Sequence, residues 1–196
     1  MLPHLVIYVS QSRSDGSDDN VTITSTATSP IDPTGSFSAE LWVYHDDLSG
    51  HQTYITKWGS TSASQSYIFG LDDTSNKPRL VEGTGSSFNT RLASTALVAN
   101  KWYHLAVTSD SSEVVFYING DEDNTISRTQ TRITGGTEDT IIAKRASLTD
   151  QTLDGRIGQI RMYSKALTST EVMQNYRFTK NDYPNGLNGT LNGYRS

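Results

Sequence analysis

The chain contains no cysteine, so disulfide bonds cannot contribute to its stability. This excludes the small disulfide-rich secreted scaffolds, while the redox compartment stays open. Hydrophobic residues make up only 34% of the sequence, but ten tyrosines, five phenylalanines and three tryptophans supply large apolar surfaces. A chain of 196 residues is long enough to bury a sizeable core. We therefore expect one β-rich domain that folds without covalent cross-links.

Long hydrophobic runs and clusters of positive charge are also missing. The apolar run at residues 5–9 is too short for a membrane span or a signal-peptide core, and no basic residue precedes it. The formal net charge is −5 and the basic residues are scattered, which is unlike the positive footprint of a nucleic-acid-binding protein. We expect no nucleic-acid partner, no membrane insertion and no export by a signal of its own. The chain would then be intracellular, released by lysis, or part of a larger protein.

Residues 101–120 (KWYHLAVTSDSSEVVFYING) carry the clearest local pattern. Both halves alternate with a period of two residues, which is typical of β-strands. Between the halves, Asp110 and Ser112 can bond to their own backbone, and Asn119 and Gly120 tolerate positive φ. We predict an antiparallel hairpin near the centre of a sheet.

Other short strands are expected at the regular spacing of a β-sandwich. They lie at residues 5–9, 20–23, 37–44, 54–58, 67–71, 79–81, 90–93, 138–143 and 156–163. In the third of these, alternation predicts that Phe37, Ala39, Leu41 and Val43 face the core. Glu40, Trp42 and Tyr44 would face the other way. By the same rule, Tyr54, Thr56 and Trp58 should share one face of the next strand.

One helix is predicted at residues 169–177. Thr168 and Glu171 have the spacing of a capping box, and Leu167 and Val172 that of a hydrophobic staple. An apolar stripe that includes Tyr176 would dock this helix on the edge of the sandwich. Residues 179–196 are rich in turn formers and poor in apolar side chains. We therefore predict a domain at residues 1–178, followed by a tail at residues 179–196 that acts as an assembly arm.

Four motifs, in order, resemble the laminin-G-like, concanavalin A-like lectin/glucanase family. They are DGSDDNV at residues 15–21, GSFSAELWV at residues 35–43, the hairpin described above, and LDGRI to YSKAL at residues 153–167. The resemblance covers roughly residues 13–176. It implies an all-β jelly-roll β-sandwich of two antiparallel sheets, with one short C-terminal helix. It does not imply one function, because this fold carries lectins, glycosidases, adhesion modules and virion proteins.

A catalytic constellation is missing from the sequence. The glucanases of this family resemble one another in a Glu-x-Asp-x-(x)-Glu strand, which places an acid and a nucleophile on one face. No such triplet occurs here, and the acidic pairs lie beside turn residues. The four histidines are not spaced as a metal cluster, and there is no Gly-x-Ser-x-Gly elbow. We expect a chain that is not an enzyme, with an active glycosidase as a distant alternative.

Calcium is a candidate cofactor, because the family often holds a structural ion where its opening turn meets its closing strand. Asp18, Asp19 and Asp154 are the carboxylates at matching positions, and Ca²⁺ prefers several oxygen ligands. Gly158 and Gln159 stand where the family often shows an acidic pair, so one ligand is missing. The alternative is that these aspartates simply form turns.

Carbohydrate binding needs aromatic faces for the apolar side of a sugar ring and polar groups for its hydroxyls. The candidate aromatic residues are Trp42, Tyr44, Tyr54, Trp58 and Tyr67, and the candidate polar partners are Glu40, Gln65 and Asn89. The alternative is that the aromatic residues belong to the core, and Trp42 and Trp102 resemble structural tryptophans of the family.

Residues 174–183 (QNYRFTKNDY) resemble the ending of laminin-G-like domains in phage and other virus structural proteins. This favours a non-enzymatic virion surface or fibre protein, either a capsid decoration or an adhesion module, that binds host glycans. Its expected partners are other virion structural proteins in an oligomeric assembly, and its expected location is the virion surface or the extracellular space. The alternative is a carbohydrate-binding module of a secreted glycan-processing enzyme.

Overall fold

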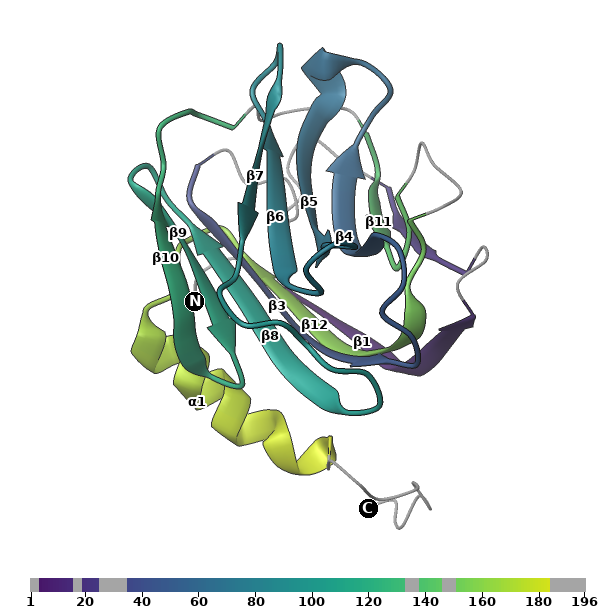
Figure 1. Ribbon diagram of the computed structural model, residues 1–196. Coiled ribbons are helices and arrows are strands. Elements are labelled where there is room, and N and C mark those ends of the chain that lie inside the picture. Colours follow the sequence, from purple (N-terminus) through teal and green to yellow (C-terminus); the bar gives the residue numbers. More distant parts are fainter. Residues whose placement is uncertain (1–3, 16–18, 25–34, 133–137, 146–150, 184–196) are drawn as a thin grey trace.

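The computed structural model describes residues 4–15, 19–24, 35–132, 138–145 and 151–183, with the backbone alone at residues 4–13. Two six-stranded antiparallel sheets face each other, and one α-helix lies in the C-terminal part of the described chain (Figure 1). The expected fold class, a jelly-roll β-sandwich with a short C-terminal helix, is confirmed. None of the described helices is long and apolar enough to cross a membrane.

The first sheet has the order β1-β12-β3-β8-β9-β10 and the second sheet the order β2-β11-β4-β5-β6-β7. The strands of the first sheet are β1 (His4–Asp15), β12 (Asp154–Tyr163), β3 (Phe37–His45), β8 (Trp102–Ser109), β9 (Glu113–Ile118) and β10 (Asp121–Ser127). Those of the second sheet are β2 (Val21–Ile23), β11 (Thr140–Ile142), β4 (Gln52–Trp58), β5 (Gln65–Leu71), β6 (Pro78–Gly83) and β7 (Phe88–Leu92).

The predicted hairpin is confirmed as β8 and β9, which lie inside the first sheet. The Asp110 carboxylate accepts hydrogen bonds from the backbone N–H groups of Ser112 (2.7 Å) and Glu113 (2.9 Å), as expected for a side chain that closes a turn. Asn119 and Gly120 have φ values of 54° and 85°, in the left-handed region that these two residue types tolerate. The residues of the two turns therefore determine where the hairpin strands begin and end, as the sequence predicts.

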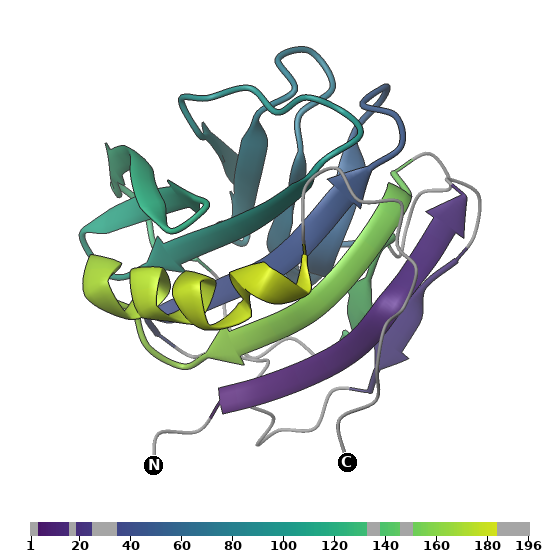
Figure 2. The same cartoon turned by 90° about the horizontal axis from the view of Figure 1, so that it is seen from below.

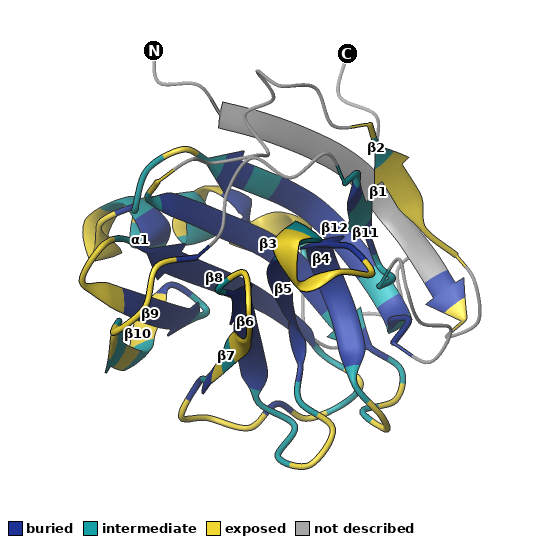
Figure 3. Ribbon diagram, turned by 90° about the horizontal axis from the view of Figure 1, so that it is seen from above, coloured by how far each residue is buried: buried dark blue, intermediate teal, exposed yellow. Residues whose placement is uncertain are grey.

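The core fills the space between the two sheets. The inward-facing residues of β3 are buried there as predicted, together with Leu105, Val107 and Phe116 from the hairpin. Figure 3 shows buried residues along the central strands and exposed residues in the loops and in the outer strands β7 and β10. Burial of this kind is the main stabilising contribution in a sandwich without disulfides.

A β-bulge in β4 changes the predicted alternation. Thr53 pairs with Gly70 and Ile55 pairs with Phe69, so Tyr54 is an extra residue in its strand. Tyr54 consequently faces the core, where its ring meets Phe69 edge to face at 5.4 Å. Trp58, which the unbroken alternation places on the same face as Tyr54, packs instead in a separate cluster on the outer side of the second sheet.

The helix α1 (Ser169–Thr179) begins where predicted and ends two residues later than predicted. Its capping box is present, because Thr168 Oγ1 accepts from the Glu171 backbone N–H and the Glu171 carboxylate accepts from the Thr168 backbone N–H. Leu167 and Val172 are both buried beside Val115, as a hydrophobic staple requires. The helix lies across the outer face of the first sheet rather than on an edge of the sandwich (Figure 2), because that face also carries apolar side chains.

The described chain stays on the first sheet beyond the boundary expected at residue 178. Thr179 is buried, and its Oγ1 accepts a hydrogen bond of 2.8 Å from Trp42 Nε1. After the short 3₁₀-helix η2 (Lys180–Asp182), the Tyr183 ring stacks on Trp42 with centroids 4.6 Å apart. The Tyr183 hydroxyl also accepts from the Gln159 backbone N–H at 2.8 Å. The remainder of the predicted assembly arm lies outside the described residues, so its role stays a prediction.

Replacement of Tyr183 tests whether this contact stabilises the sandwich. Tyr183→Ala removes a half-buried ring and should lower the free energy of unfolding by about 1–3 kcal/mol. For a domain of this size, the melting temperature should fall by roughly 3–9 °C. Tyr183→Phe keeps the stacking and removes one hydrogen bond, so it should cost only about 1 kcal/mol. If Tyr183→Ala melts like the parent protein, the ring does not stabilise the fold.

Candidate functional site

A pocket of about 280 Å³ opens on the outer face of the second sheet. β4, β6 and β7 supply much of its wall, and the turn after β5 supplies part of its rim. The side chains that matter for its chemistry are Trp58, Phe88, Arg79, Arg145, Gln151 and Asp72. Because the first sheet and its helix lie on the other side of the core, this face is not covered by α1.

Two aromatic rings form the apolar part of the pocket. Trp58 is only 2% exposed and rests on Ile68 and Val81, whereas Phe88 is 57% exposed at the start of β7. The two rings meet edge to face with centroids 6.1 Å apart. Phe88 therefore presents an accessible apolar ring at the pocket.

Three polar side chains lie beside the two rings. Arg79 is 6% exposed, and its guanidinium donates to Gln151 Oε1 at 3.3 Å. Arg145 donates to the same oxygen at 3.4 Å and lies over the Trp58 ring, 5.4 Å from its centroid. The pocket therefore combines the exposed ring of Phe88, backed by the buried ring of Trp58, with hydrogen-bond donors on the two arginines.

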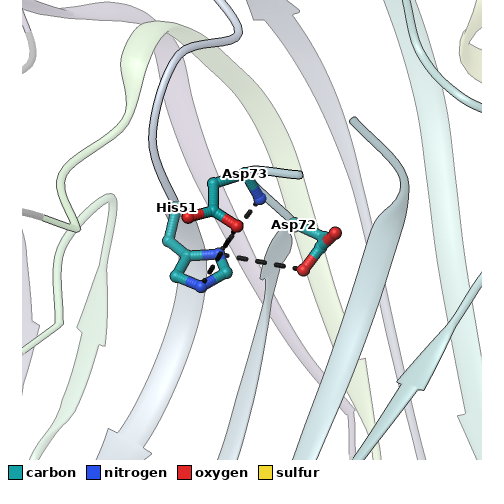
Figure 4. A group of neighbouring side chains, drawn as sticks. All are labelled: His51, Asp72 and Asp73. Carbon is teal, nitrogen blue, oxygen red and sulfur yellow. Dashed lines mark hydrogen bonds and ion pairs between the residues drawn. The ribbon is translucent and has the colours of Figure 1, made fainter. Parts of the chain in front are cut away.

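His51, Asp72 and Asp73 lie together (Figure 4), and the first two line this pocket. One ligand atom from each lies within 4.8 Å of the others, and no other group of three such side chains meets this limit in the part of the chain that the structure describes. His51 Nδ1 accepts from the Asp73 backbone N–H at 3.1 Å, and Nε2 lies 3.5 Å from Asp73 Oδ1. These contacts already engage both imidazole nitrogens, so the cluster is held together without an ion.

The five aromatic residues predicted to bind carbohydrate do not form one site. Tyr54 and Tyr67 are fully buried between the sheets, because the bulge turns Tyr54 inward and Tyr67 pairs with Phe37 in the core. Trp42 is 3% exposed beneath α1 and Tyr183. Tyr44 lies half-buried on the outer face of the first sheet, where its ring meets Trp102 at 5.7 Å. Of the five, Trp58 alone lines the pocket.

Glu40, a predicted partner for sugar hydroxyls, belongs instead to a buried network beneath α1. Its carboxylate accepts hydrogen bonds from Arg161 (3.0 Å), Tyr163 (3.1 Å) and Asn175 (3.1 Å). Burial raises the pKa of Glu40, although Arg161 and the hydrogen bonds lower it in part. Burial also lowers the pKa of the neighbouring His104 to about 3, so this imidazole is neutral. The network joins the helix to the sheet, and the Glu40 carboxylate is occupied within it.

The other predicted polar partners are also separate from the pocket floor. Gln65 is half-buried at the start of β5, and the side-chain amide of Asn89 donates to Gln130 Oε1. Phe88, by contrast, was not predicted, because the strand expected at residues 90–93 left it in a loop. Its signal in the sequence is a large apolar side chain at the point where a strand leaves a Gly/Ser turn.

The predicted calcium ligands lie where two distant segments meet. Asp15 pairs directly with Asp154 across β1 and β12, so the opening turn does reach the closing strand. Asp19 is exposed, and its carboxylate accepts from the Asp15 backbone N–H at 3.4 Å. Asp18 lies outside the described residues. The backbone thus brings the opening turn to the closing strand, but the described carboxylates of Asp15, Asp19 and Asp154 do not all come within 4.8 Å of one another, and the ion stays a prediction.

Similar solved structures share the fold at low sequence identity. Domain 4 of an extracellular GH43 arabinanase from Geobacillus stearothermophilus, in complex with arabinotriose, is 18% identical (TM-score 0.61; 88% of this chain and 87% of that one covered). The sialidase CBM40 of Ruminococcus gnavus, bound to α2,3-sialyllactose, is 12% identical (TM-score 0.63; 82% and 97%). The binding domain of paraclostridial mosquitocidal protein 1 is 15% identical (TM-score 0.66; 92% and 48%), so this chain spans about half of its length.

No curated protein matches this sequence. A family model does match, under the description concanavalin A-like lectin/glucanases superfamily, over residues 15–173. The match covers most of the chain and includes the hairpin, the pocket and the first turn of α1. The chain therefore belongs to the concanavalin A-like lectin/glucanase superfamily.

Proposed function

We propose that this chain is a non-enzymatic glycan-binding module whose ligand lies in the pocket around Trp58. The observation that carries the proposal is the pairing of Trp58 with the exposed Phe88 next to the fixed donors of Arg79 and Arg145. A sugar ring presents an apolar face to aromatic side chains and hydroxyl groups to hydrogen-bonding partners. Both kinds of surface occur here within one pocket.

The comparisons support the proposal at the level of the fold. The arabinanase domain and the sialidase module were solved with arabinotriose and with sialyllactose, so sandwiches of this kind are used to hold saccharides. Identities of 12% and 18% do not transfer their sites to this chain. The location of the pocket in this chain comes from its own side chains.

The chemistry of the pocket argues against hydrolysis. Glycoside cleavage requires two carboxyl groups on opposite sides of the scissile bond, one of them protonated. Among the described residues that line the pocket, Asp72 is the single carboxylate. Burial alone would raise the pKa of Asp72, but hydrogen bonds from Ser75 and the charges of His51 and Arg79 lower it overall. An ionised carboxylate of this kind cannot act as the general acid.

The proposed setting is the surface or fibre of a virion, where the module is held by other structural proteins in an oligomer. The support is the resemblance of residues 174–183 to endings of virus structural proteins, and part of this segment is fixed on the first sheet by Tyr183. The alternative setting is a carbohydrate-binding module of an exported glycan-processing enzyme.

An antibody against this chain should label the surface of native virus particles. Particles without label, and recovery of the chain attached to a hydrolase, would favour the alternative.

Substitution of Phe88 tests the pocket directly. Because Phe88 is largely exposed, Phe88→Ala should leave the fold intact, with an unchanged melting temperature. It removes one stacking ring, so affinity for a bound oligosaccharide should fall by roughly three- to tenfold, as measured by calorimetry after a glycan array has identified a ligand.

The matched control is Phe178→Ala, since Phe178 is 85% exposed on α1, on the opposite side of the sandwich. This variant should bind like the parent protein. Equal losses in the two variants, or no loss in either, would remove the pocket from consideration as the binding site.

We also propose that a structural calcium ion joins the opening turn to the closing strand through Asp19, Asp154 and Asp18. Binding to the folded state alone raises stability by mass action, so millimolar calcium should raise the melting temperature relative to chelator. The double variant Asp19→Ala and Asp154→Ala should lose this difference. Asp121→Ala, at the exposed start of β10, should retain it. Identical melting curves of the parent protein in calcium and in chelator would contradict the proposal.

A further inference from the structure

Arg79 is an unusual residue for the floor of a pocket. It projects from β6 beside Val81 and is only 6% exposed. Its Nε has no hydrogen-bond partner, and no carboxylate in the described part of the chain lies within ion-pair distance of its guanidinium. Burying a charged group without an opposite charge costs free energy, so buried arginines are normally paired.

A second positive charge increases this cost. Arg145 and Arg79 both donate to Gln151 Oε1, so two guanidinium groups meet at one neutral acceptor. Burial lowers the pKa of Arg79, the charge of Asp72 raises it, and the nearby charge of Arg145 lowers it again. The two cations therefore repel each other within the pocket.

The negative charges at the rim do not resolve this imbalance. Asp72 Oδ2 already accepts from the backbone N–H (3.0 Å) and the hydroxyl (2.6 Å) of Ser75. Asp73 lies against His51, with its Oδ1 3.5 Å from Nε2. Both carboxylates act on Arg79 through space, but neither forms an ion pair with it. The acceptor that the described chain gives the Arg79 guanidinium is thus the neutral Gln151 Oε1 and not a carboxylate.

We propose that the pocket binds an acidic saccharide whose carboxylate or sulfate group is held by Arg79 and Arg145 while its ring lies against the exposed Phe88. The inference rests on the proposed glycan-binding function and specifies the class of glycan. A guanidinium presents parallel N–H donors that match the two oxygens of such a group. An anion at this point supplies an acceptor to Arg79 and reduces the repulsion between the two arginines.

The test compares matched saccharides on the full-length chain. A neutral oligosaccharide, its uronic-acid counterpart and its sulfated counterpart, with the same linkages, are titrated by calorimetry. At least one of the two acidic forms should bind at least tenfold more tightly than the neutral form, and raised salt should reduce this preference. The relative affinities of the uronate and the sulfate identify which anionic group the pocket takes.

Substitutions of the two arginines test whether they cause the preference for acidic saccharides. Arg145 is half-buried at the pocket wall, so Arg145→Gln should fold, and its affinity for the acidic form should fall about tenfold more than its affinity for the neutral form. Arg156→Gln is the matched control, because Arg156 is 38% exposed and also lies over an aromatic ring, that of Tyr44, on the first sheet. It should bind like the parent protein. Arg79→Lys should weaken acidic binding, since it keeps the charge and removes the parallel donors.

Two results would overturn the inference while the proposed function stands. One is equal or tighter binding of the neutral saccharide with loss of affinity in Phe88→Ala. The other is a preference for acidic saccharides that Arg145→Gln and Arg79→Lys both retain. If no saccharide of any class binds, the proposed function fails and the inference fails with it.

Discussion

The first sheet has to bury both of its faces, and the arrangement of the rest of the molecule depends on this constraint. Every residue of β8 is buried, including Trp102, His104 and Ala106 on the side that faces away from the core. A sheet with two apolar faces needs a cover on each side. The second sheet covers one face, and α1 with Tyr183 covers the other. The helix is thus part of the hydrophobic structure and not an appendage to it.

The same constraint decides which surface is available for binding. Trp42 and Glu40 are occupied by contacts to the helical segment, so the outer face of β3 cannot present them to a ligand. In the second sheet every residue of β4 and β6 is buried as well, and Trp58, Ile68 and Val81 form an apolar cluster on its outer face beside the pocket. The bulge at Tyr54 completes this division, since it moves one aromatic ring into the core and leaves Trp58 outside.

Features encoded by neighbouring residues could be predicted from the sequence. The hairpin turn at Asp110, the capping box at Thr168 and the core face of β3 each depend on residue types a few positions apart. The pocket could not be predicted in this way. Arg79 and Phe88 come together through the pairing of β6 with β7, and Arg145 lies in the segment after β11, so no short sequence pattern indicates that the three are neighbours. Trp58 was named for its residue type, whereas its true companions depend on a one-residue bulge.

The position of Tyr183 has a consequence for how the module could be displayed. This ring is fixed on the outer face of the first sheet, while the pocket opens on the outer face of the second. Packed sheets are about 10 Å apart, so the full thickness of the sandwich separates the two points. A carrier protein that binds the chain beyond residue 183 would therefore lie on the side of the sandwich opposite the pocket. Every copy in such an array would point its pocket outward, and many weak sites could act on one glycan-coated surface at once.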